Sequence, residues 1–382
     1  MGSRRVGVFA AVLSLAAVSS CTDAGEVTTT TTTERAEAVA TVAAEVESVA
    51  RMSEAAALGA LSGRADALAD TDEFSGAVLV ARDGKVLLED AWGLADRESG
   101  TPNTPDTKFR VGSLNKMFTA IATLQLVEAG QLELDDTIGE HLVDYPNEEV
   151  AANVTVLHLL THAGGTGDIF GAEFDSNRLE LREHQDYVDL FGPRPLAFEP
   201  GTSHEYSNYG FVLLGALIEA VTGQSYYDYV RTNVFEPAGM TSTDSLPETD
   251  DVPNRAVGYT DSDDGWTPNT DALLWRGIAA GGGYSTVGDL MRFAQALSAG
   301  TLISQAMLAE ATRAQAPGYG FGFQLGRDPV LFYGHHGGSP GVSSALRVYP
   351  ELGYVVVGLS NLDEPAANNV VDYFTLRMPV AE

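Results

Sequence analysis

The sequence contains a single cysteine, very little lysine and few cations of any kind. Lys and Arg together number 22 against 53 Asp and Glu, so the formal net charge is −31. Phosphate contacts need clustered Lys and Arg, so we expect no nucleic-acid partner. The lone cysteine, Cys21, excludes an internal disulfide, and the fold must therefore depend on its core. A chain of 382 residues of which 44% are hydrophobic can bury a sizeable one.

Lysine is scarce because arginine supplies almost every cation. The lysines are Lys85, Lys108 and Lys116. Arginine stays protonated in proteins, whereas a buried lysine can lose its proton and act as a base. Each lysine is therefore a candidate for a role that arginine cannot fill.

The N-terminus has the features of an export signal. Arg4 and Arg5 precede an apolar run over Val6–Val18, which is too short to span a bilayer as a helix. The run ends in Val18-Ser19-Ser20-Cys21, which resembles a bacterial lipobox, in which the cysteine is lipidated. We therefore predict that residues 1–21 are a lipoprotein signal peptide and that Cys21 anchors an exported protein to the outer side of the cell membrane. An ordinary signal peptide is the alternative, and Sec and twin-arginine export both stay open.

The segment directly after Cys21 has few of the large apolar residues that form a hydrophobic core. Thr28–Thr33 is an unbroken threonine run, and the residues that follow are rich in Ala and Glu at helical spacing. We predict a tether and an N-terminal helix over 22–60, followed by the main domain over 61–382.

Strand-like segments lie at both ends of this domain, with helical patterns between them. Asp83-Gly84 separates two strand-like runs, as in a β-hairpin. Pro and Gly loops break the helical patterns of residues 135–275. We predict an α+β fold with an antiparallel sheet from both chain ends, flanked by helices, and an all-helical insert over about 135–275. The expected strands are 75–80, 85–92, 319–325, 330–333, 343–348 and 354–359.

Ser113-Leu114-Asn115-Lys116 opens a strongly apolar helical pattern. Ser113 is expected at the first turn, where its N–H has no helical partner and the helix dipole favours negative charge. Residues three apart share a helix face, so Lys116 should lie beside the Ser113 hydroxyl. With apolar neighbours Lys116 would have a lowered pKa and could remove the serine proton. A helix cap followed by an exposed lysine is the alternative.

Tyr206-Ser207-Asn208 precedes a second apolar helix. Tyr206 near a lysine could relay protons, because a nearby cation lowers a tyrosine pKa. Asn208 offers an amide to orient lysine and substrate. Tyr145-Pro146-Asn147 has the same pattern among acidic residues, and we predict a structural role for Tyr145.

Gly334-His335-His336-Gly337-Gly338 follows a strand-like run. If the strand continues, His335 and Gly337 point to one face and His336 to the other. Gly337 would let a substrate approach the strand edge, and the Gly338 N–H could be a second oxyanion donor beside that of Ser113.

These motifs, in this order, resemble the serine β-lactamase-like superfamily, in its branch of class C β-lactamases, D-alanyl-D-alanine carboxypeptidases and esterases. The similarity covers roughly residues 60–375. It implies that Ser113 is the nucleophile, that Lys116 and Tyr206 share acid–base work, and that Asn208, His335, Gly337 and Gly338 bind substrate, with no cofactor or metal. Histidine replaces the lysine of the third motif. A D-Ala-D-Ala-type peptidase or an esterase is therefore expected rather than a true β-lactamase, with a small molecule or a cell-wall peptide as substrate.

Three other interpretations compete with this one. Ser339 lies in a Gly-x-Ser-x-Gly pattern, but Pro340 lacks the N–H that such a nucleophile needs after it. His158 and His162 have the spacing of metal ligands on a helix, without a third ligand. The protein could also be a receptor for cell-wall peptides or penicillin that has lost turnover, although Ser113, Lys116 and Tyr206 are all present.

Overall fold

The structure is a computed structural model that describes residues 49–263, 265–327 and 330–380. The predicted signal peptide, the lipidated Cys21 and most of the predicted tether lie outside these residues. Within the described part of the chain, no helix combines the length and apolar character needed to cross a membrane.

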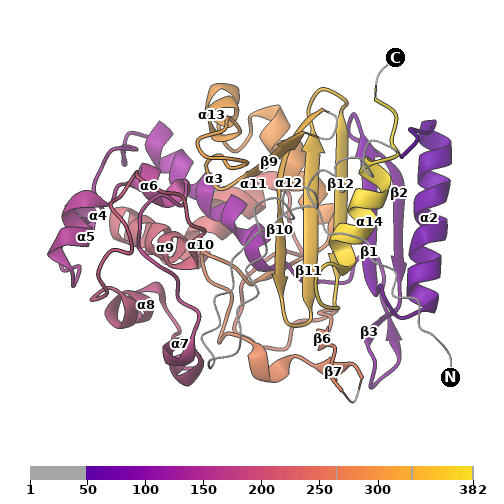
Figure 1. The fold of residues 1–382 in the computed structure, drawn as a ribbon, viewed down its shortest axis with the longest axis horizontal. Helices are drawn as coiled ribbons and strands as arrows, with labels where there is room; N and C mark the ends of the chain where they lie inside the picture. Colours follow the sequence, from indigo (N-terminus) through magenta and orange to yellow (C-terminus); the bar gives the residue numbers. More distant parts are fainter. Residues whose placement is uncertain (1–48, 264, 328–329, 381–382) are drawn as a thin grey trace, which may run out of the picture.

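A six-stranded antiparallel sheet forms the centre of the fold (Figure 1), in the order β2-β1-β12-β11-β10-β9. β1 pairs with β12 over its whole length, from Gly76 opposite Ser360 to Arg82 opposite Tyr354. Both ends of the chain therefore contribute to one sheet, as the sequence predicted. Its strands are β1 (Gly76–Arg82), β2 (Lys85–Trp92), β9 (Gln324–Arg327), β10 (Leu331–Ser339), β11 (Val342–Tyr349) and β12 (Tyr354–Ser360).

Both faces of the sheet are covered, which explains the unbroken apolar run of β1. Because side chains alternate along a strand, Val78 faces the core under α2 (Glu54–Asp70) and α14 (Ala366–Thr375). Leu79 faces the other core, where α12 (Val287–Ala299) packs on β1 and β12. α3 (Asn115–Glu128) packs on α12 through Phe118 and Phe293, whose ring centroids are 4.9 Å apart.

The turns and caps follow local chemistry. Asp83 and Gly84 both have positive φ, 50° and 78°, as the predicted two-residue hairpin between β1 and β2 requires. Thr286 caps α12 by accepting a hydrogen bond from the Asp289 N–H. The short strands pair as β3 (Leu94–Asp96) with β4 (Thr101–Pro102) and β5 (Phe109–Arg110) with β8 (Tyr284–Ser285), and α13 (Gln305–Ala311) follows α12.

The insert is helical only in its first part, so the prediction of an all-helical insert is wrong beyond Ala238. Residues 241–263 and 265–275 form loops, a 3₁₀ turn (η3, Thr270–Ala272) and a ribbon of β6 (Tyr259–Thr260) and β7 (Thr267–Pro268). Pro247, Pro253 and Pro268 interrupt this segment, and proline lacks the N–H that a helix interior needs. The helical elements are α4 (Ile138–His141), α5 (Glu148–Asn153), α6 (Val156–Leu160), α7 (Ala172–Asn177), α8 (His184–Phe191), α9 (Asn208–Thr222), α10 (Tyr226–Val230), η2 (Arg231–Phe235) and α11 (Glu236–Ala238).

Two boundaries differ from the sequence prediction. The strand expected over 319–325 begins only at Gln324, because Gly318 and Gly322 adopt positive φ of 72° and turn the chain. α2 crosses the expected boundary at residue 60 and buries Ala57, Leu61, Ala65 and Leu68 against the sheet side of the domain. This helix is therefore part of the folded core rather than of a tether.

Candidate active site

Ser113 and Lys116 lie together where the chain enters α3. A 3₁₀ turn, η1 (Gly112–Leu114), leads directly into α3, and Gly112 takes a positive φ of 53° at its start. The spacing of three residues places Lys116 Nζ 3.1 Å from Ser113 Oγ. Ser113 is at the beginning of the helical segment, so its N–H precedes the intrahelical ladder.

Lys116 is fully buried. α3 lies between the sheet side and the helical side of the domain, and Asn115 to Leu124 are all buried. Lys116 Nζ donates to Asn208 Oδ1 at 2.7 Å and to the Ala280 carbonyl at 2.5 Å. Burial lowers the pKa of Lys116 from 10.5 to about 7, and the negative charge of Asp168 opposes this shift. A substantial fraction of this amine is therefore unprotonated at neutral pH.

Tyr206 covers the lysine from the loop that precedes α9. Lys116 Nζ lies 4.6 Å from the centroid of the Tyr206 ring. The ring stays 36% exposed, yet the surroundings of its hydroxyl are desolvated enough to raise the Tyr206 pKa well above 10. Hydrogen bonding with Ser113 lowers that pKa in part. The expectation of a lowered tyrosine pKa is thus wrong because burial dominates, and the phenol is protonated at neutral pH.

His162 holds the loop that carries Tyr206. Its Nδ1 accepts a hydrogen bond from the Ser207 N–H at 3.1 Å, and its ring lies 4.3 Å from that of Tyr206, centroid to centroid. Burial keeps the pKa of His162 well below 6.5, so the ring is neutral. From the sequence, His162 is considered only as a possible metal ligand with His158, and no part in the Tyr206 loop is predicted for it.

Asn208 is the first residue of α9 and both ends of its amide are bonded within the protein. Oδ1 accepts from Lys116, and Nδ2 donates to Asp168 Oδ2 at 3.1 Å. Asp168 Oδ1 also accepts from the Asn208 N–H at 3.1 Å. The amide thus orients Lys116, and Asp168 fixes the amide. Sequence reasoning missed Asp168, since a single acid in a glycine-rich loop carries no motif.

The third motif lies on β10, beside η1. Gly112 packs so closely that an added Cβ would lie 3.1 Å from the Gly338 nitrogen. A Cβ on Gly337 would lie 2.3 Å from the Val111 carbonyl oxygen and 2.6 Å from the Ser113 nitrogen. The glycines therefore let β10 approach the N–H of Ser113.

Beyond Gly334 the outer edge of β10 pairs with no other strand of the described residues. β9 pairs with β10 only as far as Gly334 opposite Gln324. The His336 N–H donates toward that edge, to Gln324 Oε1 at 3.2 Å. Because N–H groups alternate along a strand, the Gly338 N–H faces the same edge. Because Gly337 packs against the Ser113 nitrogen and Gly112 against the Gly338 nitrogen, the N–H groups of Ser113 and Gly338 lie near each other.

His335 lies on the Tyr206 side of β10 and is buried. Its Nε2 is 3.2 Å from the Tyr319 hydroxyl, and its ring centroid is 6.3 Å from that of Tyr206. Burial, with the neighbouring His336 and Lys116, holds the pKa of His335 well below 6.5. This ring is therefore a neutral wall of the site and supplies no fixed positive charge.

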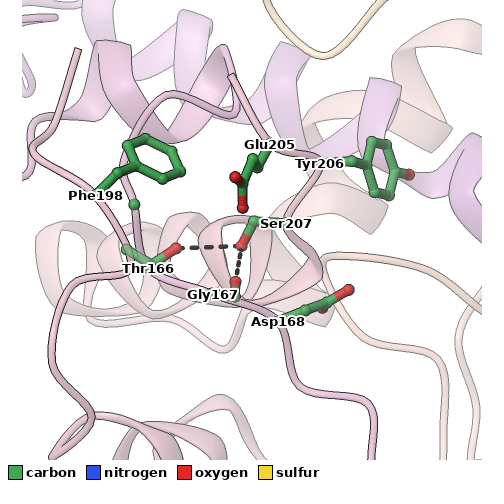
Figure 2. Close-up of a pocket in the computed structure, with 8 residues that line it drawn as sticks. Thr166, Gly167, Asp168, Phe198, Glu205, Tyr206 and Ser207 are labelled. Atoms are coloured by element: carbon green, nitrogen blue, oxygen red, sulfur yellow. Dashed lines mark hydrogen bonds between the residues drawn. The ribbon is translucent and has the colours of Figure 1, made fainter. Parts of the chain in front are cut away.

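A pocket of about 80 Å³ adjoins Tyr206. Figure 2 shows the carboxylates of Glu205 and Asp168 on its rim, and Ser207 bonded to Thr166 and to the Gly167 carbonyl. None of the residues that line it is basic. This side of the site is therefore acidic.

The residues of the competing interpretations have surroundings that do not match those interpretations. Tyr145 is buried, and its hydroxyl is 3.0 Å from that of Tyr209. Ser339 ends β10 and is followed by a turn into β11, with no helix after it. His158 accepts from the Thr155 N–H at the start of α6, whereas His162 serves the Tyr206 loop. These contacts give each of them a structural part.

Comparison with known proteins identifies the family to which this fold belongs. The beta-lactamase family model matches residues 62–377. The chain is 32% identical to penicillin-binding protein 4* of Bacillus subtilis over 324 residues, which cover 78% of this chain and 70% of the relative. Among solved structures, a penicillin-binding protein from Bacillus halodurans has a TM-score of 0.73 at 32% identity and covers 80% of this chain and 97% of its own. The D-amino acid amidase of Ochrobactrum anthropi SV3 has a TM-score of 0.69 at 28% identity, with 83% and 97% covered.

The family model spans most of the chain, and the relatives share both its sequence and its fold. This protein therefore belongs to the beta-lactamase family, as a serine hydrolase.

Proposed function

We propose that the protein cleaves amide or ester substrates through an acyl-enzyme on Ser113, with Lys116 as the first proton acceptor. The observation that carries this proposal is the position of Lys116 Nζ, 3.1 Å from Ser113 Oγ and fully buried. A pKa of about 7 makes this amine a competent base at neutral pH.

The contacts of Lys116 favour the productive proton arrangement. A neutral amine has two N–H bonds and one lone pair. Asn208 Oδ1 and the Ala280 carbonyl are acceptors, so they take the two N–H bonds. The lone pair is then left for the Ser113 hydroxyl, which donates its hydrogen to Nζ. Asn208 and Ala280 thus orient the base before substrate arrives.

Acylation then proceeds in one sequence of transfers. Lys116 takes the proton as Ser113 Oγ attacks the carbonyl carbon, and the N–H groups of Ser113 and Gly338 hold the oxyanion. Removing one such donor typically costs about 3 kcal/mol of transition-state stabilisation. The protonated Tyr206 phenol, hydrogen-bonded to Ser113, passes a proton to the leaving group and regains one from Lys116. Water activated by the same pair releases the acyl group.

We further propose that the substrate is a peptide of the D-Ala-D-Ala type or an ester rather than a β-lactam. His335 replaces the lysine of the third motif and is neutral, so it offers no fixed cation to a β-lactam carboxylate. Tyr319, bonded to His335, is also uncharged because burial raises its pKa well above 10.

Covalent labelling tests the nucleophile. The protein is treated with a fluorophosphonate or a fluorescent penicillin and the adduct is located by mass spectrometry. We expect labelling of Ser113 and its loss in S113A, while S339A serves as the matched control and keeps its label. An unlabelled Ser113 in the intact protein would favour the receptor alternative. p-Nitrophenyl acetate, nitrocefin and a D-Ala-D-Ala peptide, assayed on one preparation, separate the substrate classes.

We also propose that the protein is exported and held at the outer face of the cell membrane by a lipid on Cys21. The lipobox-like Val18-Ser19-Ser20-Cys21 supports this proposal. Phase partition in a nonionic detergent should place the protein in the detergent phase and C21A in the aqueous phase. Equal partition of the two would refute the anchor.

A further inference from the structure

Glu364 lies against the strand that carries one of the two oxyanion donors. It follows β12 and precedes α14, so it comes from the far end of the chain. A Cβ added to Gly338 would lie 2.0 Å from Glu364 Cδ and 2.3 Å from its Oε2. The carboxylate is therefore in van der Waals contact with the backbone of Gly338, whose N–H faces the open edge of β10.

The carboxylate of Glu364 lacks a partner among the residues that the structure describes. Neighbouring Asp363, by contrast, accepts hydrogen bonds from Gly341 and Thr260. Burial raises the pKa of Glu364, and its negative charge raises that of Tyr206. Glu364 is thus an exposed residue whose carboxylate is partly desolvated against Gly338 and whose field reaches the phenol of Tyr206.

A negative charge in this position would oppose the oxyanion that forms at Gly338. The nearby basic groups do not offset it, because His335 is neutral and burial lowers the pKa of His336 to about 4. Asp168 and Glu205 add two carboxylates to the pocket that Tyr206 lines. Apart from Lys116, which is partly protonated at neutral pH, the cleft therefore carries an excess of negative charge that a cationic ligand would balance.

We propose that Glu364 binds the α-ammonium group of the acyl residue, so that the substrate is an amino acid amide or ester, or a peptide, with a free N-terminus. The α-nitrogen is two bonds from the carbonyl carbon. An oxyanion on the Gly338 N–H therefore brings the ammonium beside Gly338, where Glu364 lies. The ammonium then cancels the charge that would destabilise the transition state. A free carboxylate beside the scissile bond is repelled, which shifts the preference within the peptides from carboxypeptidase towards aminopeptidase or amidase substrates.

This inference rests on the acyl-enzyme function proposed for Ser113 and narrows its substrate. The test compares alanine p-nitroanilide in both enantiomers with the N-acetyl and N-succinyl derivatives at pH 7, where the α-amine is protonated. We expect kcat/KM to be highest for a free-amine substrate and lowest for the succinyl derivative. In E364Q the value for the free amine should fall about threefold to fivefold, as for a solvent-exposed charge pair, while the values for the two acylated substrates rise.

E351Q is the matched control. Glu351 is an exposed carboxylate in the turn that follows the C-terminal end of β11, whereas Gly338 lies beside the N-terminal end of that strand. E351Q should leave the ranking of substrates as in the parent protein. If none of the anilides is turned over, the ranking is measured as protection of Ser113 from fluorophosphonate by alaninamide, N-acetylalaninamide and alanine. An equal effect of E364Q on charged and neutral ligands, or a preference for the acylated ones, would overturn the proposal. Loss of labelling at Ser113 itself would instead overturn the proposed function.

Discussion

The buried Lys116 should make stability depend on pH in a way that its replacement by methionine (K116M) abolishes. In the folded protein the pKa of Lys116 is about 7 instead of 10.5. Between these values the unfolded chain binds the proton that the folded protein has released. The free energy of unfolding therefore rises with pH across this window, and the full penalty is present below pH 7.

The size of the Lys116 pKa shift also sets how much the free energy of unfolding changes with pH. A separation of about 3.5 pKa units corresponds to about 5 kcal/mol of destabilisation at low pH, at 1.36 kcal/mol per unit. Between pH 7 and pH 9 about 2 kcal/mol of this is recovered. Methionine is of similar length and uncharged, so the variant lacks this recovery. It leaves Asn208 Oδ1 and the Ala280 carbonyl without their donor, at about 1–3 kcal/mol each, but that cost does not vary with pH.

Urea unfolding of both proteins at pH 7 and pH 9 measures the difference directly. The parent should gain about 2 kcal/mol more than K116M over this interval. All other ionisable groups cancel in the comparison. K85M, which removes an exposed lysine on β2, is the control and should follow the parent. Parallel pH dependence of the parent and K116M would refute a lowered lysine pKa and, with it, the assignment of the base.

Three other substitutions address the same centre. K116R should lose ester hydrolysis almost as completely as K116M, because arginine does not release its proton; full activity would disprove the base. D168N should move the acid limb of the pH–rate profile to lower pH, because the Asp168 charge raises the Lys116 pKa, and should lower kcat about tenfold through the loosened Asn208; an unmoved limb would contradict this coupling. G337A should reduce kcat/KM about 100-fold, since its Cβ would lie 2.6 Å from the Ser113 nitrogen, whereas G63A, with open space around it, should retain activity. Unchanged hydrolysis by folded G337A would argue against β10 as a wall of the oxyanion hole.

Much of the site could be predicted from local patterns. The three-residue spacing fixes Ser113 and Lys116 on one face of a helical turn, whatever the rest of the fold does. The hairpin at Asp83-Gly84 is likewise decided by two residues. Tyr206 and Asn208 were singled out by their chemistry and their place before an apolar helix, and the family resemblance then linked them to the first pair.

The remaining features depend on contacts between distant segments. Asp168 acts only because its loop lies next to the start of α9, and Glu364 because the chain after β12 returns to Gly338. The Tyr206 pKa was predicted with the wrong sign because a sequence shows the neighbouring cation but not the burial that outweighs it. The end of the insert was misjudged because apolar residues between prolines resemble helical spacing.

The pairing of β1 with β12 also bears on the order in which the molecule can be assembled during synthesis. The segment that carries Ser113 leaves the ribosome long before Gly338 and Tyr354. The edge of β1 that pairs with β12 has no partner until β12, the last strand, has been made. Long-range strand pairing of this kind delays folding until the chain is almost complete. A chain that ends before β10 therefore has Ser113 and Lys116 but lacks the strand that carries Gly338, so the complete site can form only when most of the sequence has been made.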